Sequence, residues 1–193
     1  MNTPNKLTLA RFIITPFFLG CLLLSFPAHI FVALALFIIA SLTDMADGKL
    51  ARRRNQVTDF GKFLDPIADK LLTTTALIGF IALRWSWGIV WVTFVILGRD
   101  FLVTSLRLMA AGRGTVIAAN IWGKIKTALL MVTIILTLLV EALIETGVLT
   151  GAAASGMRWA YSVLLWICAV AALLSCVVYL FQNKQFINPK EKS

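Results

Sequence analysis

Four aspartates in the first half of the chain have the spacing of a metal site. Asp44 and Asp47 are three residues apart, and Asp65 and Asp69 are four apart. On helices, both spacings place the two carboxylates of a pair on one face. Carboxylate oxygens are ligands that Mg²⁺ and Mn²⁺ prefer in proteins, commonly together with substrate phosphates. The two pairs therefore predict a site for two divalent cations, Mg²⁺ or Mn²⁺, and chemistry on a phosphate.

Two glycines and an arginine accompany these acids. Gly48 directly follows the first pair, and Gly61 precedes the second. Neither has a side chain, so a nucleotide or phosphate can approach the backbone closely. Arg52 lies one turn beyond Gly48 and could pair with a phosphate or orient a carboxylate. A simpler alternative is that the acids only neutralise arginines 52–54 at a membrane surface, which explains charge balance but not two helical pairs flanked by glycines.

The composition is that of an integral membrane protein. Of the 193 residues, 60% are hydrophobic and 14% are charged, and the mean hydropathy is +0.89, whereas a soluble domain is nearer half apolar. A membrane-spanning helix needs roughly 20 apolar residues. Six segments qualify, with soft edges, at about 7–26, 30–46, 66–84, 88–109, 121–143 and 158–182. We expect an all-α membrane protein of six transmembrane helices, forming a single domain over residues 1–193.

The distribution of charge predicts the orientation in the membrane. The net charge of +9 would favour nucleic-acid binding in a soluble protein, but here the cations gather where a positive-inside bias requires them. They lie before the first span, between spans two and three, between spans four and five, and after the last. The other side holds only Arg84 and Arg158, with Glu141 and Glu145. This asymmetry predicts cytoplasmic termini, a cytoplasmic acidic cluster and no nucleic-acid partner.

The fixed residues from Asp44 to Asp69, with Ala51 included, read D-x2-D-G-x2-A-R-x8-G-x3-D-x3-D. This pattern resembles the signature of the CDP-alcohol phosphotransferases, and all eight fixed positions are present. The resemblance implies the six-helix membrane fold of that family, usually dimeric, with a dinuclear metal site at the cytoplasmic face.

The resemblance also implies roles for individual residues. Asp69 is implied to be the general base as well as a metal contact. The implied metal ligands are Asp44, Asp47, Asp65 and Asp69. The implied cytidine diphosphate site is lined by Asp44, Asp47, Gly48, Ala51, Arg52 and Gly61.

Further segments are similar to one bacterial branch of the family, the phosphatidylglycerophosphate synthases. These segments cover roughly the first two thirds of the chain: residues 4–11, 65–71, 98–100, 105–107 and 123–127. Asp100 departs from the branch, which more often has the longer glutamate there. The resemblance implies transfer of a phosphatidyl group from CDP-diacylglycerol to sn-glycerol 3-phosphate, yielding phosphatidylglycerol phosphate and CMP. It also implies a homodimer that lies among the membrane lipids of a bacterial inner membrane, with the active site facing the cytoplasm.

An anionic acceptor needs a cationic pocket, and four basic residues are candidates for it. They are Arg99, Arg107, Lys124 and Lys126. Each has a simpler alternative. Arg99 could form a structural ion pair with Asp100 facing the helix bundle, because charges inside a membrane are paired or functional. Lys124 and Lys126 could only signal topology.

Other functions remain open at this point. Within the family, the acceptor could be a second phosphatidyl group, as in a cardiolipin synthase, or inositol phosphate; the basic residues disfavour L-serine. A divalent-cation transporter would also gather carboxylates, but a conduction path needs polar groups through the membrane depth. Residues 31–39 and 76–82, at the far ends of spans two and three, are almost wholly apolar. The complete signature disfavours a scaffold without activity.

Overall fold

In a computed structural model, the described part of the chain forms six helices. The structure describes the backbone of residues 3–54, 59–112 and 121–182, and within these ranges the side chains of residues 8–43, 67, 70–110, 123 and 125–182. Over these ranges the structure contains no strand. The helices are α1 (Thr3–Leu23), α2 (His29–Arg54), α3 (Asp59–Leu83), α4 (Ile89–Gly112), α5 (Ile121–Glu145) and α6 (Gly151–Gln182).

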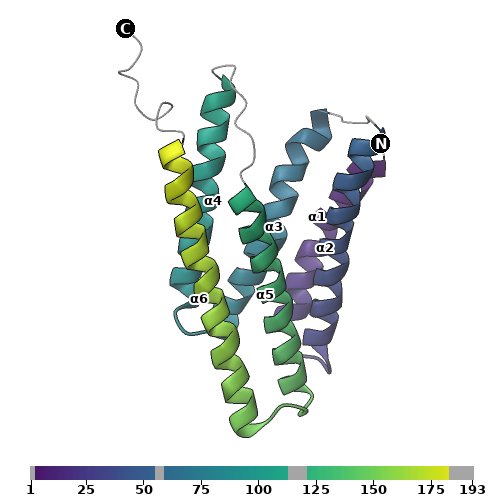
Figure 1. Cartoon of the computed structure of the whole chain (residues 1–193). Helices are drawn as coiled ribbons and strands as arrows, with labels where there is room; N and C mark the ends of the chain where they lie inside the picture. The colour runs from purple at the N-terminus through teal and green to yellow at the C-terminus, as the bar shows by residue number, and fades with distance from the viewer. Residues whose placement is uncertain (1–2, 55–58, 113–120, 183–193) are drawn as a thin grey trace.

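The helices alternate in direction along the bundle (Figure 1). The start of α1 and the end of α6 lie at one end, which we call the terminal end. The last turns of α2 and α4 and the first turns of α3 and α5 point to the same end. The predicted alternation is therefore present, and it places the signature residues of α2 and α3 at the terminal end.

Three helices have the length and composition to cross a membrane within the described residues. These stretches are Ile89–Ala110, Ile125–Glu145 and Gly151–Gln182, and the apolar parts described for the other helices are the shorter Thr8–Leu23, His29–Thr43 and Lys70–Leu83. Large apolar side chains such as Trp91, Phe94 and Phe101 are exposed on the outer surface of α4. A soluble monomer rarely exposes so continuous an apolar surface, so the helices suit a membrane.

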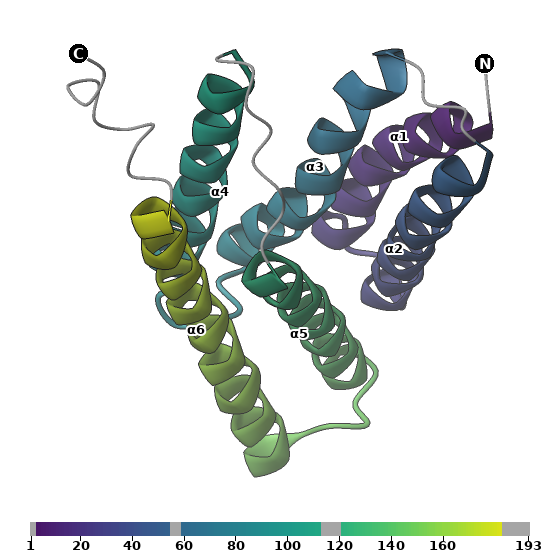
Figure 2. The same cartoon turned by 45° about the horizontal axis from the view of Figure 1, so that its top comes forward.

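The bundle consists of two groups of helices joined by α5. Helix α1 packs against α2 and α3, whereas α6 packs against α4 and α5. Helix α5 also packs against α2, and it lies between the two groups in both views (Figure 2). This arrangement brings α4 and α5, which carry the predicted acceptor residues, beside the helices that carry the aspartates.

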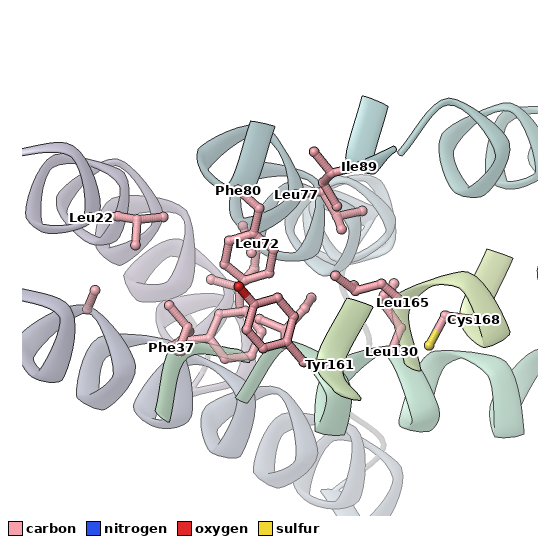
Figure 3. Close-up of a cluster of buried hydrophobic side chains, with 14 of the residues drawn as sticks. Leu22, Phe37, Leu72, Leu77, Phe80, Ile89, Leu130, Tyr161, Leu165 and Cys168 are labelled. Carbon is pink, nitrogen blue, oxygen red and sulfur yellow. The ribbon is translucent and has the colours of Figure 1, made fainter. Parts of the chain in front are cut away.

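Side chains from all six helices form the core. Phe18, Phe37 and Phe80 are fully buried, and Figure 3 shows Phe37 and Phe80 close to Tyr161 of α6. Membrane helices gain stability mainly from close packing, which small residues permit. Gly79 is such a position, because a Cβ atom there would lie 2.3 Å from Cδ2 of Leu22. The close approach of α1 to α3 therefore favours glycine, since a larger residue would displace the Leu22 side chain.

The predicted start of the last span at residue 158 is wrong. Helix α6 begins at Gly151, seven residues before the expected edge of that span. The charge of Arg158 is accommodated inside the helix because its Nε and Nη2 atoms each donate to the buried carboxylate of Glu141, both at 2.8 Å. The hydroxyl of Tyr161 lies 2.6 Å from the same carboxylate. This cluster fastens α5 to α6 at the end opposite the terminal end.

Gly88 ends the turn between α3 and α4 in a conformation that favours glycine. Its φ angle is +67°, and a Cβ atom would lie 2.7 Å from the indole ring of Trp166. The ring of Trp166 packs at 5.8 Å from that of Trp87, and its Nε1 atom donates to the carbonyl of Trp87. The turn is thus held against α6, which fixes where α4 begins.

Candidate functional site

The helix backbones place the eight signature residues at the terminal end. Residues 44–52 occupy the last turns of α2, and residues 61–69 occupy the first turns of α3. Their side chains lie outside the described ones, so the predicted roles of Asp44, Asp47, Asp65 and Asp69 stay predictions, as do those of Gly48, Ala51, Arg52 and Gly61. The donor set consists of oxygen atoms only, which suits Mg²⁺ or Mn²⁺. Among the side chains that the structure does describe, no group of three potential metal ligands occurs.

Two predicted acceptor residues from different helices meet at Asp100. Nη1 of Arg99 on α4 lies 3.1 Å from the Asp100 carboxylate. Nζ of Lys126 on α5 lies 2.6 Å from the same oxygen atom. Lys126 is almost fully buried, with 3% of its side chain exposed. The ion pair of Arg99 with Asp100, given above as the simpler alternative for Arg99, therefore exists, but it is part of a larger group.

Arg99 also contacts the last helix. Its Nη2 atom donates to the hydroxyl of Ser175 on α6 at 2.8 Å. A Cβ atom at Gly123 would lie 3.5 Å from Nη2, in ordinary contact, so the guanidinium lies against the start of α5. Its Nε atom is buried, and it has no hydrogen-bond partner among the described atoms. Arg99 is thus held by α4 and α6 and retains one unused buried donor.

A third cation reaches Asp100 from α3. Nζ of Lys70 lies 3.4 Å from the carbonyl oxygen of Asp100 and also donates to the hydroxyl of Thr104. That hydroxyl in turn donates to the Asp100 carbonyl at 2.7 Å. These residues border a pocket of about 360 Å³ between α3 and α4, which apolar residues such as Leu71 and Phe101 complete.

We call Lys70, Arg99, Asp100 and Lys126 the Asp100 cluster. Arg99 and Lys126 contact the Asp100 carboxylate, and Lys70 contacts the Asp100 carbonyl. Three cations against one carboxylate leave a surplus of two positive charges in the cluster. Charges taken out of water are costly unless they are paired. The cluster therefore has the charge of a site for an anion.

Arg107, another predicted acceptor residue, is not brought to this cluster. Arg107 lies two helical turns beyond Arg99 on α4 and is exposed. Its Nε atom donates to the hydroxyl of Tyr179, and its guanidinium lies 5.8 Å from the centre of the Tyr179 ring. The side chain of Lys124 lies outside the described residues. The predicted roles of both in acceptor binding stay predictions.

Sequence reasoning missed three members of this region. Lys70 was included in the similar segment 65–71 and among the cations between spans two and three, but its contact with α4 was not predicted. Asp100 was noted as a departure from a related branch and as an alternative partner of Arg99, but its contact with Lys126 depends on tertiary structure, since α4 and α5 both pack against α6. Ser175 lies in an apolar stretch of α6 and gave no signal.

Comparison with known proteins places these features in a family. Residues 1–174 match the CDP-alcohol phosphatidyltransferase family. The chain belongs to that family. Members of the family generally depend on divalent cations, in agreement with the oxygen donors on α2 and α3.

Several relatives carry the same name, CDP-diacylglycerol–glycerol-3-phosphate 3-phosphatidyltransferase. The protein of Bacillus subtilis is 49% identical over 139 residues, covering 65% of this chain and 70% of its own length. That of Wigglesworthia glossinidia brevipalpis is 34% identical over 185 residues, covering 94% of each chain. That of Haemophilus influenzae is 33% identical, covering 93% of this chain and 91% of its own. The similarity therefore spans all six helices of this CDP-alcohol phosphatidyltransferase.

Proposed function

We propose that this protein transfers a phosphatidyl group from CDP-diacylglycerol to sn-glycerol 3-phosphate, giving phosphatidylglycerol phosphate and CMP. Relatives that match nearly the whole chain carry the name of this enzyme. Arg99 and Lys126 both contact Asp100, and this pair of cations is the observation that supports an anionic acceptor. A phosphate monoester carries about −1.5 to −2 charges at pH 7, which matches the positive surplus of the Asp100 cluster.

In the proposed reaction, a hydroxyl of the acceptor attacks the phosphorus atom that bears the lipid. A new P–O bond forms to the acceptor, and the bond from that phosphorus to the bridging pyrophosphate oxygen breaks, releasing CMP. Asp69 takes the proton of the attacking hydroxyl. This role requires the Asp69 carboxylate to lie within hydrogen-bond reach of that hydroxyl. Arg99 and Lys126 hold the acceptor phosphate, with Arg107 and Lys124 as further proposed contacts.

We propose that Asp44, Asp47, Asp65 and Asp69 hold two divalent cations, Mg²⁺ or Mn²⁺. Such ions neutralise charge on a pyrophosphate and stabilise a leaving oxygen. The cytidine diphosphate would lie along the same turns of α2 and α3. Its proposed contacts are Asp44, Asp47, Gly48, Ala51, Arg52 and Gly61.

The proposed setting is a bacterial inner membrane, with all six helices as spans. The excess of cations at the terminal end supports a cytoplasmic location of the termini and of the active site. A homodimer is part of the proposal, on the strength of the family resemblance.

An acceptor comparison tests this function. Purified protein in lipid–detergent micelles receives CDP-diacylglycerol, Mg²⁺ and one acceptor at a time: glycerol 3-phosphate, inositol phosphate, phosphatidylglycerol or L-serine. We expect CMP release with glycerol 3-phosphate. Release with only another acceptor would refute the proposed substrate, and metal flux into proteoliposomes without any CMP release would favour a transporter.

A further inference from the structure

Lys70 connects the helix that carries Asp69 to the Asp100 cluster. It directly follows Asp69 in the sequence, and its side chain reaches across to α4. There its ammonium group donates to the Asp100 carbonyl, at 3.4 Å, and to the Thr104 hydroxyl. An ammonium group has three donors, so these two bonds use most of its capacity. The ammonium group of Lys70 is therefore held by α4.

Asp100 is the residue at which three helices meet. Its carbonyl accepts from Lys70 of α3, and its carboxylate accepts from Lys126 of α5 and from its neighbour Arg99. Since one carboxylate oxygen, Oδ1, accepts both of the latter bonds, its position sets the separation of the two cationic groups. Displacing Asp100 would thus move both groups that are proposed to hold the acceptor phosphate.

We propose that Asp100 and Lys70 are positioning residues for the acceptor phosphate. Asp100 aligns the guanidinium of Arg99 with the ammonium of Lys126. Lys70 fixes Asp100 relative to α3, and so fixes the distance from the bound phosphate to Asp69, the proposed base. This inference rests on the proposed function and adds to it two residues that do not themselves carry the reaction.

The inference differs from simple attraction by net charge. Replacing Asp100 with asparagine removes the only carboxylate of the Asp100 cluster and raises the positive surplus from two to three. Attraction by net charge alone then predicts tighter binding of an anionic acceptor. Positioning predicts weaker binding, because the neutral amide oxygen holds the two cations less strongly than the carboxylate does. The sign of the change in KM for glycerol 3-phosphate therefore separates the two explanations.

The threonines of α3 and α4 offer a matched control for Lys70. The hydroxyl of Thr104 bonds the carbonyl of Asp100 within α4, and that of Thr73 bonds the carbonyl of Lys70 within α3. Of these two hydroxyls, the one of Thr104 also accepts a bond from the Lys70 ammonium. Thr104→Val therefore removes a partner of the Lys70 ammonium group, whereas Thr73→Val makes the same chemical change and removes only a bond to the Lys70 carbonyl.

The experiment measures CMP release by the full-length protein, with KM for each substrate determined at saturating concentration of the other. Lys70→Met and Asp100→Asn are expected to raise KM for glycerol 3-phosphate by about tenfold or more, the order expected for a lost charge-assisted hydrogen bond. KM for CDP-diacylglycerol is expected to stay within about twofold, the scatter allowed for an unaffected site. In Lys70→Arg and Asp100→Glu, KM for glycerol 3-phosphate should return most of the way to the wild-type value. Thr104→Val should show part of the increase in this KM, and Thr73→Val should show none.

Each other outcome has a definite meaning. Wild-type-like KM values for Lys70→Met and Thr104→Val would overturn the role of Lys70, and a lower KM for Asp100→Asn would overturn the role of Asp100. Equal increases in both KM values would indicate general damage to the fold and would also overturn the inference. Absence of glycerol 3-phosphate-dependent CMP release by the wild-type protein would instead refute the proposed function, and this inference with it.

Discussion

Replacing Lys126 with methionine removes a cation that the fold has buried at the proposed acceptor site. The ammonium group lies 2.6 Å from the Asp100 carboxylate, and only 3% of the side chain is exposed. Methionine keeps much of the length and apolar volume of lysine, so the packing of α5 against its neighbours is largely retained. The positive surplus of the Asp100 cluster falls from two to one.

The expected effect follows from the interaction that is lost. A charge-assisted hydrogen bond to the acceptor phosphate contributes about 1.5–3 kcal/mol, and each 1.4 kcal/mol corresponds to about tenfold in affinity. Coulomb attraction between unit charges 4 Å apart near a protein surface, about 4 kcal/mol, sets the upper limit. We therefore expect KM for glycerol 3-phosphate to rise by about 10- to 150-fold.

The assay follows initial rates of CMP release at saturating CDP-diacylglycerol while the acceptor concentration is varied. Lys126→Arg keeps the charge and serves as the matched variant, with a smaller expected increase in KM. Thermal unfolding in detergent checks that the variants are folded. An unchanged KM for glycerol 3-phosphate in folded Lys126→Met would refute the assignment of Lys126 to the acceptor site.

Two further predictions concern the opposite end of the bundle and the metal. Glu141→Gln should lower the free energy of unfolding by about 1.5–3 kcal/mol, because the buried carboxylate accepts bonds from Arg158 and contacts Tyr161. The side chain of Glu145 is more exposed than that of Glu141 (21% against 3%), so Glu145→Gln should lower it by less than about 1 kcal/mol. Equal losses for the two variants in denaturant unfolding would contradict this difference. Chelation with EDTA should abolish CMP release, and Mg²⁺ or Mn²⁺ should restore it; turnover that survives complete chelation would contradict the metal site.

Most of the fold could be predicted from the sequence because apolar length is a local property. The six helices lie where six apolar segments were expected, and the direction of each follows from alternation. The start of α6 could not be predicted, since Arg158 looked like the polar edge of a span. Its charge is neutralised by Glu141 from another helix, and such pairing depends on tertiary structure.

The candidate site was predictable to the extent that its chemistry lies in short motifs. Arg99 and Lys126 were identified because an anionic acceptor requires a cationic pocket. The fold brings these two residues together. The role of Asp100 in joining them could not be predicted, because it arises where α3, α4 and α5 meet. Arg107 seemed equivalent to Arg99 in sequence, but its side chain lies on Tyr179, two turns away.

The most direct measurement is the rate of CMP release by Asp69→Asn, compared with Asp59→Asn. Both variants replace an acid of α3 by its amide, but only Asp69 belongs to the signature. With glycerol 3-phosphate and Mg²⁺ saturating, loss of a general base should slow Asp69→Asn by about 10²- to 10⁴-fold, while Asp59→Asn keeps the wild-type rate. Turnover of folded Asp69→Asn at the wild-type rate would contradict the proposed chemistry at the ends of α2 and α3.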